Sequence, residues 1–313
     1  MKILNFGSLG IDYVFSVDHF VRPGETLLAK ERQIYCGGKG LNQSIALAKA
    51  GAMVFQAGAI GSDGGFLLDT LRSCGVNVDL VRCLEDVGTQ NALIQVNGEG
   101  QNCILLYGGA NQALTQEMVD GAFAGFEKGD YLVLQNEVNL ADQMIRAGHQ
   151  KGMRVILNPS PLNEAIDRLP LELVDMFILN EVEGEGLSHT ADKERMIFAL
   201  RERFPRAAIV LTLGGDGSVY LEAGQSEPVY QRAYRVEAVD TTAAGDTFTG
   251  YLVAGLARGL APAAAMERAS AAAAISVTRK GAAPSIPNEE EVSAFLQRVG
   301  AETIHDESQE KFH

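Results

Sequence analysis

The sequence has no tryptophan, few cysteines and no excess of positive charge, and the last two features disfavour several classes of function. Its 313 residues include four cysteines, with no Cys-x-x-Cys pair and no His-Glu-x-x-His motif, which disfavours a disulfide framework or a zinc site. Lysine and arginine total 26 against 40 acidic residues, and the net charge of −14 disfavours nucleic acid and anionic membranes as partners. No apolar run approaches the roughly 20 residues of a membrane span. Because no signal-peptide cleavage pattern follows the first residues, we expect a cytoplasmic protein.

Two common nucleotide-binding signatures are also missing. The only Gly-Lys pair is Gly38-Lys39, and Gln33 stands where a P-loop would need its first glycine. No Gly-x-Gly-x-x-Gly fingerprint occurs either, which disfavours a dinucleotide-dependent oxidoreductase. An anionic substrate would therefore need a helix N-terminus, backbone N–H groups or a metal ion.

Short apolar runs alternate with helical patterns along the chain. We predict two helices, at 42–50 and 64–74, that end before Gly51 and Gly75. The predicted strands are residues 3–6, 53–59, 131–135, 154–158, 176–179 and 208–212. This alternation predicts an α/β protein with a mainly parallel sheet between two layers of helices.

Two further stretches interrupt the alternation. Residues 92–96 and 103–107 flank Asn97-Gly98 and predict a hairpin, and residues 26–35 predict another extended segment. We interpret them as parts of a small β lid, built from about residues 11–36 and 89–110. The whole chain is expected to form one domain, with a loose polar end at 301–313.

The segment 238–248 has the clearest chemical pattern. An extended stretch leads into Ala243, Ala244 and Gly245, and an amphipathic helical pattern follows Asp246. Small side chains at a helix N-terminus let an anion approach the backbone N–H groups. Asp246 could accept a proton from a hydroxyl placed beside a phosphoryl group. An isolated aspartate in such a position more often only caps the helix.

Three further segments resemble the ribokinase-like, or PfkB, family of carbohydrate kinases, and they occur in that family's order. They are 37–43 (Gly-Gly-Lys-Gly-Leu-Asn-Gln), 180–183 (Asn-Glu-Val-Glu), and 212–217 together with 276–285. The resemblance extends over about residues 3–287. It implies transfer of the ATP γ-phosphoryl group to a primary sugar hydroxyl, with D-ribose as the first candidate and D-ribose 5-phosphate as its product. Asp246 would be the base, and the N–H groups of Ala243, Ala244 and Gly245 would stabilise the phosphate charge.

The resemblance also implies roles for individual residues. Mg²⁺ would be bound by Glu183 through water, and paired lids would form a homodimer. Gly10 departs from the family, because ribokinases commonly have an asparagine there that contacts the sugar, so Gly10→Asn is predicted to raise ribose affinity. The sugar would contact Asp12, Gly38, Lys39, Gly40, Asn42, Glu137 and Asp246; ATP would lie against Asn180, Thr212, Gly214, Gly215, Gly217, Gly245 and Ser270; K⁺ would be held by Asp240, Thr242, Ser276, Arg279, Gly281 and Ser285.

Other interpretations stay open. A kinase of the same family could act on a hexose, a deoxyribose or a nucleoside, and the aromatic residues of the lid, including Tyr13 and Tyr35, would suit a nucleobase. A sugar sensor without catalysis is a further hypothesis, which an intact Asp246 disfavours. Residues 37–40 could form an ordinary turn and 180–183 a solvated loop, while Gly281 could merely end a helix.

Overall fold

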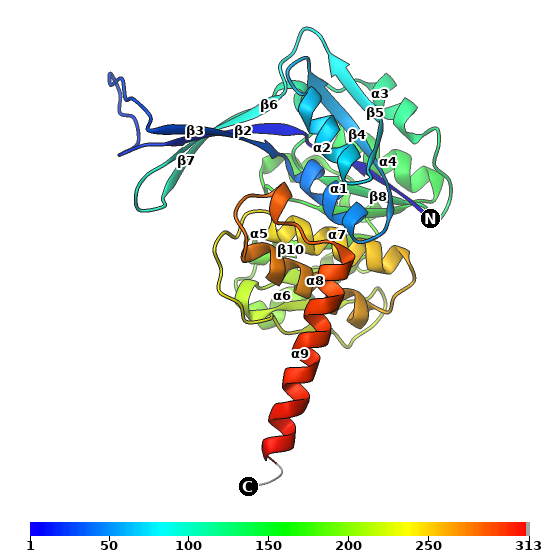
Figure 1. The fold of residues 1–313 in the computed structure, drawn as a ribbon. Helices are drawn as coiled ribbons and strands as arrows, with labels where there is room; N and C mark the ends of the chain where they lie inside the picture. Colours follow the sequence, from blue (N-terminus) through cyan, green and yellow to red (C-terminus); the bar gives the residue numbers. More distant parts are fainter. Residues whose placement is uncertain (311–313) are drawn as a thin grey trace.

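Residues 1–310, which the computed structural model describes, contain a nine-stranded sheet in the order β13-β12-β11-β10-β9-β8-β1-β4-β5 (Figure 1). Pairing is parallel from β11 to β5, and β12 and β13 form an antiparallel edge. The predicted, mainly parallel sheet is therefore confirmed. Its strands are β1 (Lys2–Phe6), β4 (Met53–Gly61), β5 (Asn77–Leu84), β8 (Tyr131–Gln135), β9 (Arg154–Asn158), β10 (Met176–Asn180), β11 (Ala208–Thr212), β12 (Ser218–Leu221) and β13 (Val229–Gln231).

Helices cover both faces of this sheet, which gives the three predicted layers. Alternation along β1 places Ile3 in one apolar core and Leu4 and Phe6 in the other. The first core is covered by α1 (Lys39–Lys49), α2 (Gly65–Ser73), α7 (Ala244–Ala257), α8 (Pro262–Val277) and the start of α9 (Glu289–Glu310). The second is covered by α3 (Gln116–Phe123), α4 (Ala141–Lys151), α5 (Glu181–Ser188) and α6 (Lys193–Arg203). Gly51 and Gly75 have φ of 81° and 85° just after α1 and α2, as expected of helix-ending glycines.

The predicted lid is a separate four-stranded sheet that projects from the body of the molecule (Figure 1). Its order is β3 (Glu31–Gly37), β2 (Gly10–Ser16), β6 (Gln90–Val96) and β7 (Asn102–Tyr107). β6 and β7 form the predicted hairpin, and β2 pairs parallel with β6. The extended segment predicted at 26–35 begins only at Glu31, because its partner β2 ends at Ser16, which pairs with Glu31.

Residues 301–310 differ from the loose tail predicted at 301–313, and the last three residues of that prediction lie outside the described part of the chain. Helix α9 continues to Glu310 and projects from the body (Figure 1). The sequence after Pro287 has no proline to stop the helix, and alanine, glutamate and glutamine favour its extension. Within residues 1–310, no helix has the length and apolar character needed to cross a membrane.

Candidate active site

The N-terminus of α7 lies beside the carboxyl ends of the central parallel strands, the usual place for ligands in such sheets. Ala243 precedes the helix in the left-handed region, with φ of 60°, and its small side chain limits the strain. The Ala244 amide donates to the Thr241 carbonyl at 3.2 Å. No acceptor among the described residues pairs with the N–H groups of Ala243 and Gly245. Two of the three predicted amides are therefore free to bind an anion, while that of Ala244 closes the turn.

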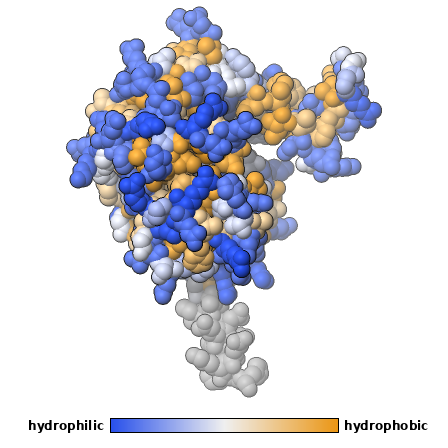
Figure 2. Space-filling model, turned by 180° about the vertical axis from the view of Figure 1, so that it is seen from behind, coloured by the Kyte–Doolittle hydropathy of each residue, from blue (hydrophilic) through white to orange (hydrophobic). Residues whose placement is uncertain are grey.

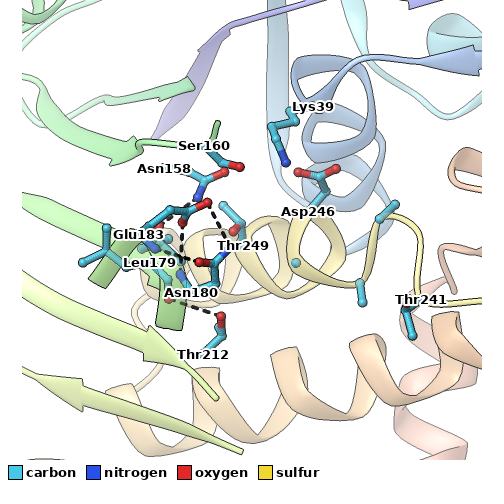
Figure 3. Close-up of a pocket in the computed structure, with 14 residues that line it drawn as sticks. Lys39, Asn158, Ser160, Leu179, Asn180, Glu183, Thr212, Thr241, Asp246 and Thr249 are labelled. Atoms are coloured by element: carbon cyan, nitrogen blue, oxygen red, sulfur yellow. Dashed lines mark hydrogen bonds between the residues drawn. The ribbon is translucent and has the colours of Figure 1, made fainter. Parts of the chain in front are cut away.

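Asp246 lies in the first turn of α7, as predicted, and its buried carboxylate is held by two amides from α1. Asn42 Nδ2 donates to Asp246 Oδ2 at 3.1 Å, and Gln43 Nε2 donates to Oδ1 at 2.9 Å. In Figure 3 the Lys39 amine and the Asp246 carboxylate point toward each other beside the cavity. Burial alone would lower the pKa of Lys39, but the carboxylates of Asp246, Glu137 and Glu183 raise it above its ordinary value. Lys39 therefore stays charged next to Asp246.

Gln43 was not predicted as a site residue, although it belongs to the recognised 37–43 segment. It is fully buried, and its Oε1 accepts from Gln135 Nε2 at 2.7 Å. Gln135 Nε2 also donates to Asn5 Oδ1 at 2.9 Å. Because Gln135 occupies the Gln43 oxygen, the Gln43 nitrogen must face Asp246. The network fixes one of the two amides that hold the carboxylate.

The predicted sugar residues Lys39, Gly40 and Glu137 meet at Ser8, in the loop after β1. The Ser8 hydroxyl donates to Glu137 Oε2 and accepts from the Gly40 amide at 3.2 Å. The Lys39 amide donates to the same Glu137 oxygen at 3.1 Å. Burial raises the pKa of Glu137, against the opposing effects of the Ser8 hydrogen bond and of Lys39. This carboxyl group therefore holds its proton to a higher pH than an exposed glutamate does.

Glycines 38 and 40 allow α1 to pack directly on the loop after β1. Gly38 has φ of 96°, and a Cβ atom there would lie 2.7 Å from the Ser8 carbonyl oxygen. A Cβ atom at Gly40 would lie 2.4 Å from the carbonyl carbon of Gly7. The close approach brings Lys39 and Asn42 to the site, which a simple surface turn would not require.

Asp12 lies on β2 of the lid, where the charge of Glu137 reaches it. Burial, with a further contribution from Glu137, raises the pKa of Asp12 to about 6. Asp246, by contrast, acts electrostatically on both Lys39 and Glu137. Electrostatic interactions thus link Asp246 with Lys39 and Glu137, and Glu137 with Asp12, and such a set of polar groups suits a polyol.

Two adjoining cavities meet at the start of α7. The smaller, of about 230 Å³, is polar and contains Lys39, Glu183 and Asp246 (Figure 3). The larger, of about 560 Å³, is lined by apolar side chains such as Tyr234 and Val236. Both cavities include Asn180, Thr212 and Gly245 in their walls. All seven residues predicted to contact ATP line the larger cavity, namely Asn180, Thr212, Gly214, Gly215, Gly217, Gly245 and Ser270.

The residues predicted for Mg²⁺ lie in the wall of the smaller cavity. Glu183 is almost fully buried, and its Oε2 and Oε1 accept from the Asn180 backbone N–H and side-chain amide at 3.0 and 2.9 Å. Asn180 Oδ1 in turn accepts from the Glu183 amide. Each carboxylate oxygen keeps a further lone pair, so a hydrated Mg²⁺ fits this hard oxygen group.

The residues predicted for K⁺ come from two segments that the structure brings together. Asp240 Oδ2 accepts from the Gly281 amide at 2.9 Å, and Oδ1 accepts from the Thr242 amide at 2.9 Å. Burial opposes the effect, but these hydrogen bonds hold the pKa of Asp240 below its ordinary value. The Ser276 carbonyl accepts from Arg279, and the Ser285 hydroxyl donates to Ala282. A carboxylate whose charged form is favoured, near the carbonyl groups of a helix end, fits a monovalent cation.

Three comparisons with known proteins agree with this geometry. A family model for pfkB family carbohydrate kinases matches residues 1–289. Ribokinase from Haemophilus influenzae is 36% identical over 301 residues, which cover 94% of this chain and 97% of that protein. Deoxyribokinase from Salmonella typhi is 34% identical over 306 residues, covering 95% and 99%. The structure of Arabidopsis thaliana ribokinase complexed with ribose and ATP matches with a TM-score of 0.83 and 29% identity, covering 94% and 98%.

Proposed function

The chain belongs to the pfkB family of carbohydrate kinases, and we propose that it transfers the γ-phosphoryl group of ATP to the primary hydroxyl of D-ribose. The product is D-ribose 5-phosphate. The observation that carries the proposal is the position of Asp246, whose carboxylate is held by two amides at the first turn of α7 where two cavities meet. ATP fits the larger, partly apolar cavity, and the sugar fits the polar groups between Asp246 and Asp12.

Asp246 takes the proton of the attacking hydroxyl. Its two hydrogen bonds fix the plane of the carboxylate, so a hydroxyl beside it meets a preoriented acceptor. The free amides of Ala243 and Gly245, together with the positive end of the α7 dipole, stabilise the charge on the phosphoryl oxygens. Lys39 adds a positive charge on the same side. Positioning and charge stabilisation thus supply most of the catalysis, as usual in phosphoryl transfer.

Two cations complete the proposal. Glu183, with Asn180 beside it, would hold Mg²⁺ through water, and bound Mg²⁺ would neutralise charge on the phosphates. Asp240 and the carbonyl groups of Thr242, Ser276, Arg279 and Gly281, with Ser285, would hold K⁺. Bound K⁺ would steady the turn that presents the Ala243 and Gly245 amides.

A second candidate substrate is 2-deoxy-D-ribose, because a deoxyribokinase matches this chain about as well as the ribokinases do. ADP release measured with D-ribose, 2-deoxy-D-ribose, hexoses and nucleosides decides between them, and phosphorus NMR locates the new ester. Turnover of 2-deoxy-D-ribose but not of D-ribose would move the assignment to the second candidate. Failure to release ADP with every acceptor would reject the kinase function.

We also propose that the protein is a cytoplasmic homodimer joined through its lids. The outer strand β7 exposes four consecutive apolar side chains, Ile104, Leu105, Leu106 and Tyr107. Figure 2 shows apolar surface on this projecting part of the molecule. An edge strand of this kind suits pairing with a second copy. The four cysteines are free, which suits a reducing compartment that supplies ATP.

A further inference from the structure

The lid strand β2 presents an almost bare stretch of backbone where the sugar is proposed to lie. Gly10 pairs with Gly37 of β3 on one side and with Gln90 of β6 on the other. Paired residues share a face of the sheet, and Asp12, two residues along β2, shares it too. Because Gly10 and Gly37 have no side chains, polar groups from neighbouring positions cover this face of the lid sheet.

Those groups are the Asp12 carboxylate and the Gln90 amide. Both Asp12 carboxylate oxygens lie 2.5 Å from the place that a Cβ atom of Gly37 would occupy. Gln90 Nε2 lies 2.9 Å from the corresponding place at Gly10. Gln90 thus fills the space into which a side chain at position 10 would project. A polar group is present where the sequence suggested that one was missing.

The orientation of the Gln90 amide is determined by Asn111. The fully buried Asn111 donates from Nδ2 to Gln90 Oε1 at 2.7 Å and to the Leu9 carbonyl at 3.1 Å, while its Oδ1 accepts from the Leu9 amide at 3.3 Å. Asn111 is therefore anchored to the backbone, and the Gln90 oxygen must face it. The Gln90 nitrogen then points the other way, toward Gly10.

This nitrogen has no acceptor among residues 1–310, although the Gln90 residue is only 5% exposed. The nitrogen itself is not completely enclosed by protein. A ligand oxygen can therefore reach it. A donor that is fixed in direction, nearly buried and unpaired is one that a bound ligand would satisfy.

From this geometry we infer that Gln90 determines sugar specificity by donating a hydrogen bond to a secondary hydroxyl at C2 or C3 of the pentose. The inference rests on the proposed sugar kinase function. A hydroxyl both donates and accepts, and Asp12 and Gln90 offer it an acceptor and a donor on one face of the lid. Asp12 and Gln90 belong to the lid strands β2 and β6, whereas Asp246 belongs to α7, so we assign to them hydroxyls that do not react. Gln90 binds and selects the sugar and takes no part in the transfer itself.

The test compares wild type with Gln90→Leu on D-ribose, 2-deoxy-D-ribose and 3-deoxy-D-ribose. We expect KM for D-ribose to rise roughly 2- to 12-fold, the range for one neutral hydrogen bond, with kcat and KM for ATP nearly unchanged. One of the two deoxy sugars lacks the contacted hydroxyl, and its KM should change less than about twofold. Gln95→Leu, the same change on the same strand but on the opposite face, is the control and should leave KM for D-ribose unaltered.

An equal loss with all three sugars would show a merely structural role, and no loss would show that Gln90 does not contact the sugar; either result overturns the inference. If Gln90→Leu melts well below wild type, Gln90→Met, which keeps the length of the side chain, takes its place. Wild-type enzyme that turns over none of the three sugars contradicts the ribose kinase function instead. Calorimetric dissociation constants for the same sugars and variants then decide the role of Gln90, and failure of all three to bind rejects it.

Discussion

Replacement of Asp246 by asparagine separates proton transfer from all other roles of this residue. The change keeps the shape of the side chain but removes the acceptor for the hydroxyl proton. General-base catalysis contributes about 10²- to 10⁴-fold, so kcat should fall by at least roughly 10²-fold. A residue that only capped α7 would give a different result, because asparagine caps a helix about as well as aspartate.

The structure indicates that the variant will fold. An amide at position 246 has one oxygen and one NH₂ group, and these face Gln43 Nε2 and Asn42 Nδ2. Gln43 cannot turn over, because Gln135 holds its oxygen. Asn42 can, since its Oδ1 is buried without a partner and would accept from the new NH₂ group. The number of hydrogen bonds is conserved, and the free energy of unfolding should change by no more than about 1 kcal/mol.

Turnover, calorimetric affinity for sugar and ATP, and melting temperature should be measured on one preparation. We expect a stable protein that binds both ligands within several-fold of wild type and is nearly inactive. Turnover close to that of wild type would refute the role of Asp246 as the base. A large loss of stability would show that the Asn42 amide does not turn to accept a hydrogen bond from the new NH₂ group.

Two further predictions concern charge. Burial raises the pKa of Asp12 to about 6, so KM of the wild-type enzyme for the sugar should increase as pH falls from 7.5 to 5.5. In Asp12→Asn, KM for the sugar should already exceed the wild-type value at pH 7.5 and should be nearly independent of pH. A raised carboxyl pKa means that the folded state binds the proton more tightly than the unfolded chain, so the charged form of Asp12 destabilises the fold at pH 7.5. Asp12→Asn removes this charge and should raise the free energy of unfolding at pH 7.5 by about 1 to 2 kcal/mol. The difference between the variant and wild type should disappear toward pH 4, where Asp12 is protonated in the folded state. If Asp240 and the 276–285 segment hold K⁺, replacing the potassium salt with that of a bulky organic cation at equal ionic strength should lower kcat. In Asp240→Ala, kcat should no longer depend on which of the two cations is present. Equal activity in both salts would contradict the cation site.

The central strands of the sheet could be predicted because they are buried on both faces. Predicted bounds agree with those observed at β8, β9 and β11, where apolar runs are flanked by polar or turn residues. Strand β5, at the edge of the sheet, was not predicted. Its apolar residues alternate with polar ones such as Asp79 and Arg82, and only β4 pairs with it. Its pattern therefore lacks the continuous apolar run that marks a central strand.

The sequence also brought together residues that share one cavity, since all seven residues predicted to contact ATP line the larger one. Each belongs to a short segment with a local physical reason, such as the end of a strand or a turn of glycines. Gln43 and Gln135 were not predicted as parts of the site, because their roles depend on contacts between residues 92 positions apart. An amide in a sequence gives no sign of which groups will orient it.

Gly10 shows how a missing side chain in a motif can mislead. From the sequence alone, Gly10→Asn is predicted to restore a sugar contact, but in the structure a Cβ atom at Gly10 would lie 2.9 Å from Gln90 Nε2. The new side chain would displace the existing amide, so the single variant should gain no affinity for D-ribose. Combined with Gln90→Gly, the same substitution has the space free and should recover most of the affinity that Gln90→Gly alone loses. A higher affinity in the single variant would show that both amides fit at once and that Gln90 does not occupy the contact position.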